Sequence, residues 1–138
     1  MPLQNTELIV MSACDTGQGE VHSGEGLPGI QRAFQVAGVR TTVASVWKVD
    51  DTATQMLMEQ FHTNLAGNRL SRLDALREAQ LRLLHSGKDA LRESAQRSIA
   101  RGGDTRGADL VIEQLDALRD DRLPPYYWAA FTLSGDWR

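Results

Sequence analysis

The chain has 138 residues, of which 41% are hydrophobic and 24% are charged, and this composition is ordinary for one globular domain. A formal net charge of −3 and a pI near 5.6 give no electrostatic reason to expect nucleic acid or an anionic membrane as a partner. The single cysteine cannot form an internal disulfide, and the N-terminus lacks the basic and long apolar regions of a secretion signal, so we expect a cytoplasmic protein.

The first third of the sequence predicts a strand, a helix and a second strand. Leu8 to Met11 is a continuous apolar run, which is typical of a strand covered on both faces by helices. Residues 27–37 then place apolar side chains at helical spacing, and Gly38 is well suited to end that helix. Thr41 to Trp47 is rich in β-branched residues and predicts a strand parallel to the first, because a helix separates the two.

Two more helices are expected after the second strand. Asp50 or Asp51 is predicted to cap a helix that ends at Gly67. Ser71 to Asp74 resembles a capping box and opens the next helix.

The last third of the sequence predicts short helices and a third strand. After Ser86-Gly87, residues 88–100 could form a separate polar helix, and residues 111–118 mark another short one. Pro124-Pro125 is expected to end this helix, and Trp128 to Leu133 to form a strand. The pattern as a whole predicts an α/β fold with a mostly parallel sheet of about three strands.

Cys14 follows the first predicted strand, just ahead of the glycine-punctuated loop of residues 15–19. In open parallel α/β sheets, reacting groups collect at the carboxyl ends of the strands. The position of Cys14 therefore indicates a nucleophile. The alternative is a core residue, since free cysteine is among the most buried residue types.

Four sequence blocks resemble a known family. They are Ser12–Gly17, Ser23–Phe34, Val43–Asp51 and Tyr126–Asp136. In this order they resemble the CHAT domain, the caspase-like cysteine peptidase domain that usually accompanies tetratricopeptide repeats in bacterial proteins. The resemblance implies a three-layer α/β/α caspase-like fold that hydrolyses peptide bonds in a protein substrate without a cofactor. It covers roughly residues 7–85 and 124–136, which leaves a less familiar helical insertion at about 86–122.

The resemblance also implies which residues act. Cys14 would be the nucleophile, and its backbone N–H would supply one half of the oxyanion hole. The general base would be a histidine in a His-Gly turn at the end of an earlier strand, but the sequence contains no His-Gly pair. We therefore expect residues 1–138 to be the C-terminal portion of such a domain, inactive alone. His22 is either a substitute base or a solvated loop residue, whereas His62 and His85 are typical of structural positions on helices.

Several residues near the predicted strand ends are candidates for substrate binding. The carboxylates of Asp15, Asp50 and Asp51 would favour a basic residue before the cleaved bond, although helix capping competes for the last two. Ser45 and Trp47 end the second strand, where related peptidases pair an extended substrate with the sheet, although Trp47 is equally plausible in the core. No Cys/His cluster has metal-ligand spacing, so a metal site is not expected.

Two functional classes follow from the sequence. The first is the nucleophile-bearing part of a cysteine endopeptidase, completed by an N-terminal half and by tetratricopeptide repeats that this chain does not contain. The second is a non-catalytic protein-interaction module derived from a peptidase. Without preceding strands, the edge of the Leu8–Met11 strand would expose unpaired backbone groups. Self-association through this edge is therefore expected.

Overall fold

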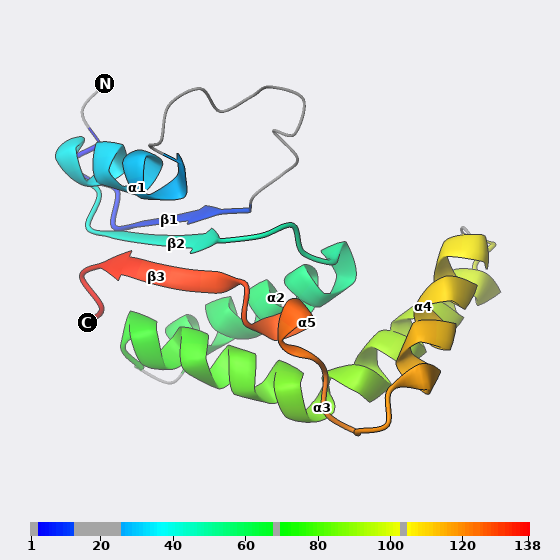
Figure 1. Ribbon diagram of the computed structural model, residues 1–138. Helices are drawn as coiled ribbons and strands as arrows, with labels where there is room; N and C mark the ends of the chain where they lie inside the picture. The colour runs from blue at the N-terminus through cyan, green and yellow to red at the C-terminus, as the bar shows by residue number, and fades with distance from the viewer. Residues whose placement is uncertain (1–2, 13–25, 68–69, 103–104) are drawn as a thin grey trace.

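The computed structural model describes residues 3–12, 26–67, 70–102 and 105–138. Its elements are strand β1 (Leu8–Met11), helix α1 (Gly26–Val36), strand β2 (Thr41–Ser45), helices α2 (Asp51–Gly67), α3 (Arg72–Ala100), α4 (Thr105–Ala117) and α5 (Pro125–Trp128), and strand β3 (Phe131–Gly135). Helix α1 lies on one face of the sheet, and α2 and α3 lie on the other (Figure 1). The described chain therefore has three layers, which confirms the predicted α/β fold class.

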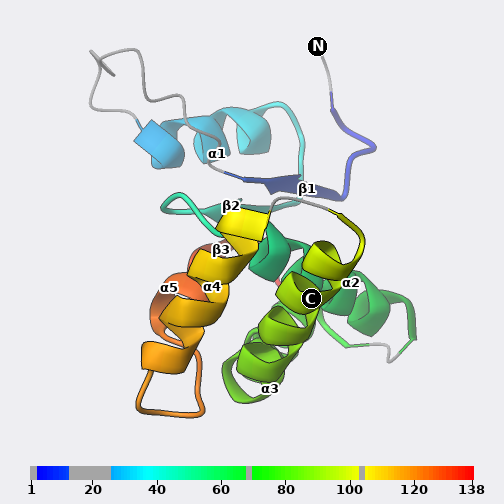
Figure 2. The same ribbon diagram turned by 90° about the vertical axis from the view of Figure 1, so that its right-hand side faces the viewer.

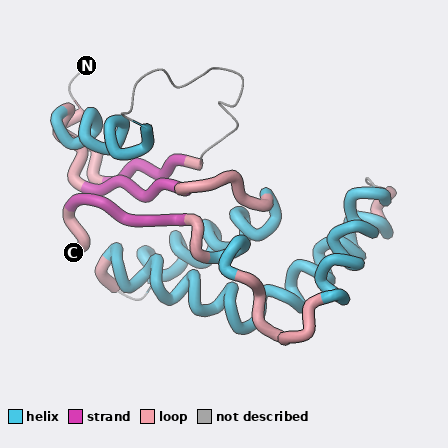
Figure 3. The backbone as a smooth tube through the Cα atoms, in the orientation of Figure 1, coloured by secondary structure: helices cyan, strands magenta, loops and turns pink. Residues whose placement is uncertain are grey.

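The sheet has the order β1-β2-β3 and is mixed, and Figure 3 shows its strands side by side. Strands β1 and β2 are parallel, as predicted, with Leu8 opposite Thr41 and Met11 opposite Ala44. Strand β3 runs antiparallel to β2 and begins opposite Ser45, where β2 ends. Strand β3 is antiparallel to β2 because the helices of residues 51–128 bring the chain back to the edge of the sheet at which β2 ended. The carboxyl ends of β1 and β2 and the start of β3 thus share one edge.

Burial differs sharply between the two parallel strands. All five residues of β2 are buried, as expected for a central strand with a helical layer on each face. Strand β1 is only partly buried, and Val10 is 37% exposed. The expectation that β1 is covered on both faces was wrong, because the face that carries Val10 is partly open to solvent.

The ends of three helices follow their sequence signals. Helix α1 stops at Gly38, which has φ 102°, and the Val39 N–H donates to the Phe34 carbonyl at 3.0 Å, as in a Schellman motif. Asp50 caps α2, because its Oδ1 accepts a hydrogen bond of 2.8 Å from the Ala53 N–H. Ser71 caps α3 by accepting from the Asp74 N–H at 3.1 Å.

The main core lies between the sheet and the helices α2 and α3. Its larger buried side chains are Val43, Leu57, Phe61, Leu76, Leu91, Leu115, Leu123 and Phe131. The apolar spacing of the helices predicts their buried faces, and burial of such side chains contributes roughly 1.5–3 kcal/mol each.

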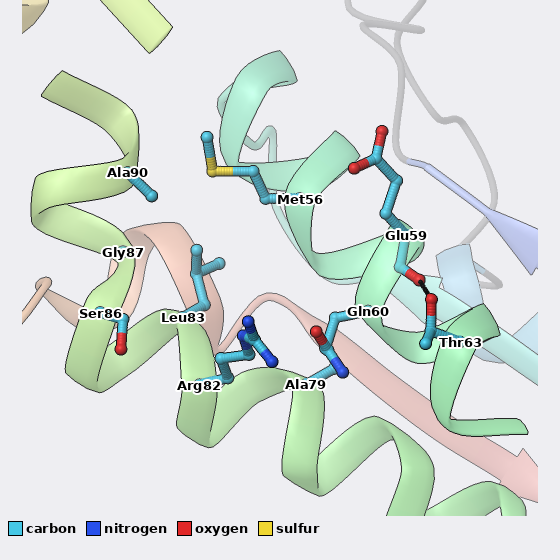
Figure 4. Close-up of a pocket in the computed structure, with 10 residues that line it drawn as sticks. All are labelled: Met56, Glu59, Gln60, Thr63, Ala79, Arg82, Leu83, Ser86, Gly87 and Ala90. Carbon is cyan, nitrogen blue, oxygen red and sulfur yellow. Dashed lines mark hydrogen bonds between the residues drawn. The ribbon is translucent and has the colours of Figure 1, made fainter. Parts of the chain in front are cut away.

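Helix α3 runs through Ser86-Gly87 without a break, so the prediction of two helices there was wrong. The reason lies in packing. A Cβ atom built on Gly87 would overlap the Cδ1 atoms of Leu123 and Leu83, so the absent side chain makes room for Leu123 (Figure 4 shows Gly87 and Leu83). The helix tolerates the glycine, at a cost of about 0.5–1 kcal/mol, because the packing of Leu91 and Leu123 compensates for it.

Two boundaries near the C-terminus also differ from the prediction. Helix α4 already ends at Ala117, and the two prolines instead begin α5, with Pro125 in its first turn. A proline is favoured there because its missing N–H would have no intrahelical partner. Strand β3 therefore starts at Phe131 rather than at Trp128.

Helices α3 and α4 form a hairpin that extends beyond the sheet, and Figure 2 shows the two helices side by side. Arg92 of α3 forms an ion pair with Asp116 of α4. The Lys88 ammonium donates to the Leu118 carbonyl at 3.3 Å, just after α4. These contacts fasten the C-terminal end of α4 to α3. Within the described ranges, no helix has both the length and the apolar character that crossing a membrane requires.

The Gly87→Ala substitution is expected to destabilise the protein. Overpacking against two buried leucines costs about 1–3 kcal/mol, whereas the higher helix propensity of alanine returns about 1 kcal/mol. We expect a lower free energy of unfolding in urea, and a smaller loss when Leu123→Ala is already present. Gly67→Ala is the control, because a Cβ atom there meets nothing within 4 Å. Equal stabilisation by both alanine substitutions would contradict this packing account.

Candidate functional site

The candidate site is the sheet edge at which β1 and β2 end and β3 begins. The parallel register sets Met11, the last residue of β1, opposite Ala44 near the end of β2. Cys14 follows Met11 by three positions in the sequence. Cys14 and Asp15 lie outside the described residues, which stop at residue 12 before this loop.

Ser45 is the last residue of β2 and is enclosed. It is 1% exposed and lies opposite Phe131 of β3. Of the four predicted substrate-binding residues that the structure describes, Ser45 is therefore the one whose side chain is shielded from solvent.

Trp47 lies at the surface rather than in the core. It is 37% exposed, and its Nε1–H donates to the Tyr126 carbonyl at 3.1 Å. Val46 and Tyr126 beside it are each 48% exposed. We call these three residues, Val46, Trp47 and Tyr126, the edge patch. It offers an exposed apolar surface at the end of β2, whose main chain is fixed by the Val46 N–H donating to the Ala130 carbonyl at 2.9 Å.

Asp50 directly precedes helix α2, and Asp51 is the first residue of that helix. Asp50 is the capping residue, so the helix-cap alternative holds for it. Asp51 is exposed in the first turn of α2. Both line a hollow of about 590 Å³ that lies among the start of α2, the C-terminal half of α3, and α4.

Tyr127 is affected by the charge of Asp50 and packs against Tyr126 of the edge patch. Burial raises the pKa of the Tyr127 hydroxyl above its ordinary value of 10.0, and the negative charge of Asp50 and the neighbouring Tyr126 raise this pKa further. The Tyr126 and Tyr127 rings pack edge to face with centroids 5.2 Å apart. The carboxylate of Asp50 therefore acts on the same tyrosine pair that holds Trp47.

The sequence pattern alone does not assign the tyrosines to the site. Trp47 and Tyr126 are 79 positions apart, and no local pattern connects them. The available signal was indirect, because Tyr126 opens one of the four blocks that carry the family resemblance.

The described histidines are on helices, and one further hollow lies between α2 and α3. His62 and His85 are on helices α2 and α3, as expected, and His22 is outside the described residues. In the described ranges, no three His, Cys, Asp or Glu side chains are grouped so that they could hold a metal ion. A hollow of about 320 Å³ between α2 and α3 is lined by Met56, Arg82, Leu83 and others, and by none of the predicted site residues (Figure 4).

Comparison with known proteins identifies the family. A family model described as the CHAT domain matches residues 1–136, a range that includes Cys14, both parallel strands and the edge patch. The curated proteins and the solved structures gave no match to this chain. Since the matched range is nearly the whole sequence, the chain belongs to the CHAT domain family, which is related to caspase-like peptidases.

Proposed function

We propose that this chain provides the nucleophile of a caspase-like cysteine endopeptidase, with Cys14 attacking a peptide bond of a protein substrate. The main support is the parallel register of β1 and β2, which brings the residue three positions before Cys14 opposite Ala44. The thiol-bearing loop and the residues from Ser45 to Asp51 therefore start from the same edge, as in other α/β sites formed at strand ends.

The chemistry requires a base, which the family resemblance assigns to a His-Gly turn that the sequence does not contain. A cysteine with the ordinary pKa of about 8.5 is mostly protonated at neutral pH, and a nearby imidazolium is the usual means of raising the thiolate fraction. The sulfur would attack the carbonyl carbon, the Cys14 N–H would stabilise the oxyanion, and the leaving amine would take a proton from the imidazolium. Because the sequence contains no His-Gly pair, the histidine comes from another segment or chain.

The edge patch and the carboxylates suit an extended polypeptide. Trp47 and its two exposed neighbours offer apolar contact beside the end of β2. Asp15, Asp50 and Asp51 bring negative charge to the loops that follow the strands, which favours a basic residue before the cleaved bond. Ser45 would contribute through its main chain, since its side chain is enclosed.

The exposed side of β1 is where a completing segment would dock. Among the described residues, the backbone groups on this side of β1 have no neighbouring strand, and Val10 of the same strand is exposed. Unpaired strand edges accept further strands. In this proposal the histidine-bearing segment adds to this edge, tetratricopeptide repeats recruit the substrate, and a second copy of the chain can pair with the same edge.

The purified 138-residue chain is expected to cleave peptides negligibly. A positioned acid or base contributes about 10²–10⁴-fold, and both roles lack their histidine. The measurement is turnover of a fluorogenic peptide library, with and without a second polypeptide from the same gene or its neighbours that carries a His-Gly turn. Turnover that requires both polypeptides and is lost in Cys14→Ala would support the proposal. Robust turnover by the chain alone, abolished by Cys14→Ala, would contradict the need for an added base, and the absence of turnover in both conditions would favour the interaction module.

The Val10→Lys variant is expected to weaken self-association of the chain. A lysine on an exposed strand edge disfavours the addition of another strand. Sedimentation velocity over a range of concentrations measures the shift from oligomer to monomer. The control is Ile30→Lys, which adds the same charge at an exposed position on α1. A chain that stays monomeric at high concentration, or an equal effect of both lysines, would argue against association at β1.

Tyr127 is expected to ionise above pH 10. In Tyr126→Phe it is the remaining one of the two tyrosines, so the ultraviolet absorbance of tyrosinate reports it alone. The midpoint should stay above 10.0, because burial is the largest cause of the shift. Adding Asp50→Asn should lower the midpoint by removing a negative charge while keeping a capping side chain. Since the pKa is raised in the folded state, this group stabilises the fold below pH 10, and the stabilisation is lost as the pH rises through the folded pKa. A midpoint at or below 10.0 would contradict the described surroundings of Tyr127.

A further inference from the structure

The hollow beside Asp50 and Asp51 results from the way helices α3 and α4 pack against each other. The ion pair between Arg92 and Asp116 holds the two helices together at one end. Further along, the facing residues are small, namely Ser94, Ala95, Ser98, Gly107 and Ala108. The helices therefore leave a space of about 590 Å³ next to the start of α2. Ligand sites typically have about 300–1,000 Å³.

The chemistry of this hollow is amphipathic and acidic. Its apolar wall consists of Leu91, Ala95, Ala108 and Val111, and its hydroxyl groups come from Thr52, Ser94 and Ser98. The two charged residues of the lining are both acidic, Asp50 and Asp51. An aliphatic chain that ends in a cation matches both halves of this lining, because its stem can pack on apolar side chains while its head pairs with a carboxylate.

Both carboxylates have oxygen atoms that can accept a further hydrogen bond. Asp50 uses Oδ1 to cap α2, which leaves Oδ2 for another donor. Asp51 is exposed and forms no ion pair with any residue in the described ranges. Its carboxylate is therefore available to a ligand that enters from solvent.

The adjoining hollow limits how many positive charges fit. It shares Thr52, Ser94 and Ser98 with the acidic hollow, but its charged lining has two arginines, Arg97 and Arg101, against one carboxylate, Glu59. A second cation next to the first would be repelled by these guanidinium groups. The pair of hollows thus favours one isolated basic side chain over a polybasic segment.

We propose that the hollow formed by α2, α3 and α4 binds one lysine or arginine side chain of a peptide segment. The inference rests on the proposed function for the nature of the ligand, a polypeptide substrate. It goes further by making the α3–α4 hairpin a specificity element, in which the apolar wall holds the aliphatic stem and Asp50 and Asp51 hold the charge.

Binding of short labelled peptides to the full chain tests the proposal. Fluorescence anisotropy would compare an alanine-rich peptide that has a central lysine with the same peptide carrying norleucine, which keeps the stem and removes the charge. The lysine peptide is expected to bind about tenfold more tightly, the size of one charge-assisted hydrogen bond. A peptide with three adjacent lysines is expected to bind no better than the single-lysine peptide, apart from the statistical gain of having three binding residues.

Two variants and a control locate the binding. Asp51→Asn should weaken the lysine peptide about tenfold and leave the norleucine peptide unchanged. Ser98→Trp, at an exposed position of the lining, should block both peptides by filling the hollow. The control is Asp89→Asn, which removes an exposed carboxylate of α3 outside the hollow.

The proposal is overturned if the lysine peptide does not bind, if norleucine binds equally well, or if Asp89→Asn weakens binding as much as Asp51→Asn. Because this assay requires no reaction at Cys14, its result is separate from that of the turnover assay. Lysine binding by a chain whose thiol proves inert would refute the peptidase and keep the basic-residue site. Turnover without a preference for lysine would refute the basic-residue site and keep the peptidase.

Discussion

The parallel pairing of β1 with β2 is the constraint on which the rest of the structure depends. Its register, with Leu8 opposite Thr41, fixes which side chains face each layer, and a slip of one residue would turn every side chain of β1 to the opposite face. The same pairing makes both strands end at one edge. Because β3 returns antiparallel from that edge, the Trp47 loop and the two tyrosines meet there.

The helical layer is fastened to each strand by polar side chains as well as by the apolar core. The Arg72 guanidinium of α3 donates to Glu7 beside β1 at 3.2 Å and to Thr41 of β2 at 3.3 Å. Gln80 of the same helix donates to the Phe131 carbonyl of β3 at 3.0 Å. Helix α3 thus holds all three strands in register, and its extension past the sheet provides the wall of the acidic hollow. One long helix connects the stability of the sheet to the shape of the proposed binding site.

Local signals in the sequence predicted much of this fold. The Ser71 cap, the glycine stop at Gly38 and the Asp50 cap all depend on neighbours within a few positions, and each is found as expected. Predictions failed where distant contacts override local preference. The sequence at Gly87 predicts a helix break, but the packing of Leu123 against this glycine keeps α3 continuous.

The candidate site shows the same division between local and distant information. The strand ends and the carboxylates could be placed from the sequence, because parallel strands end at a common edge. The contact of Trp47 with Tyr126 could not be predicted, since it joins residues from opposite ends of the chain. The α3–α4 wall of the hollow was also not predictable, because it depends on how small residues on two helices face each other.

The most direct test of the central claim is whether the single cysteine lies beside the end of β2. Bimane attached to Cys14 is quenched by a tryptophan at short range, and the chain has three tryptophans. Our account predicts that Trp47→Phe restores bimane fluorescence, whereas Trp137→Phe, at the opposite end of the sheet, leaves it unchanged. Fluorescence that is insensitive to Trp47 or is restored by Trp137→Phe would contradict the account.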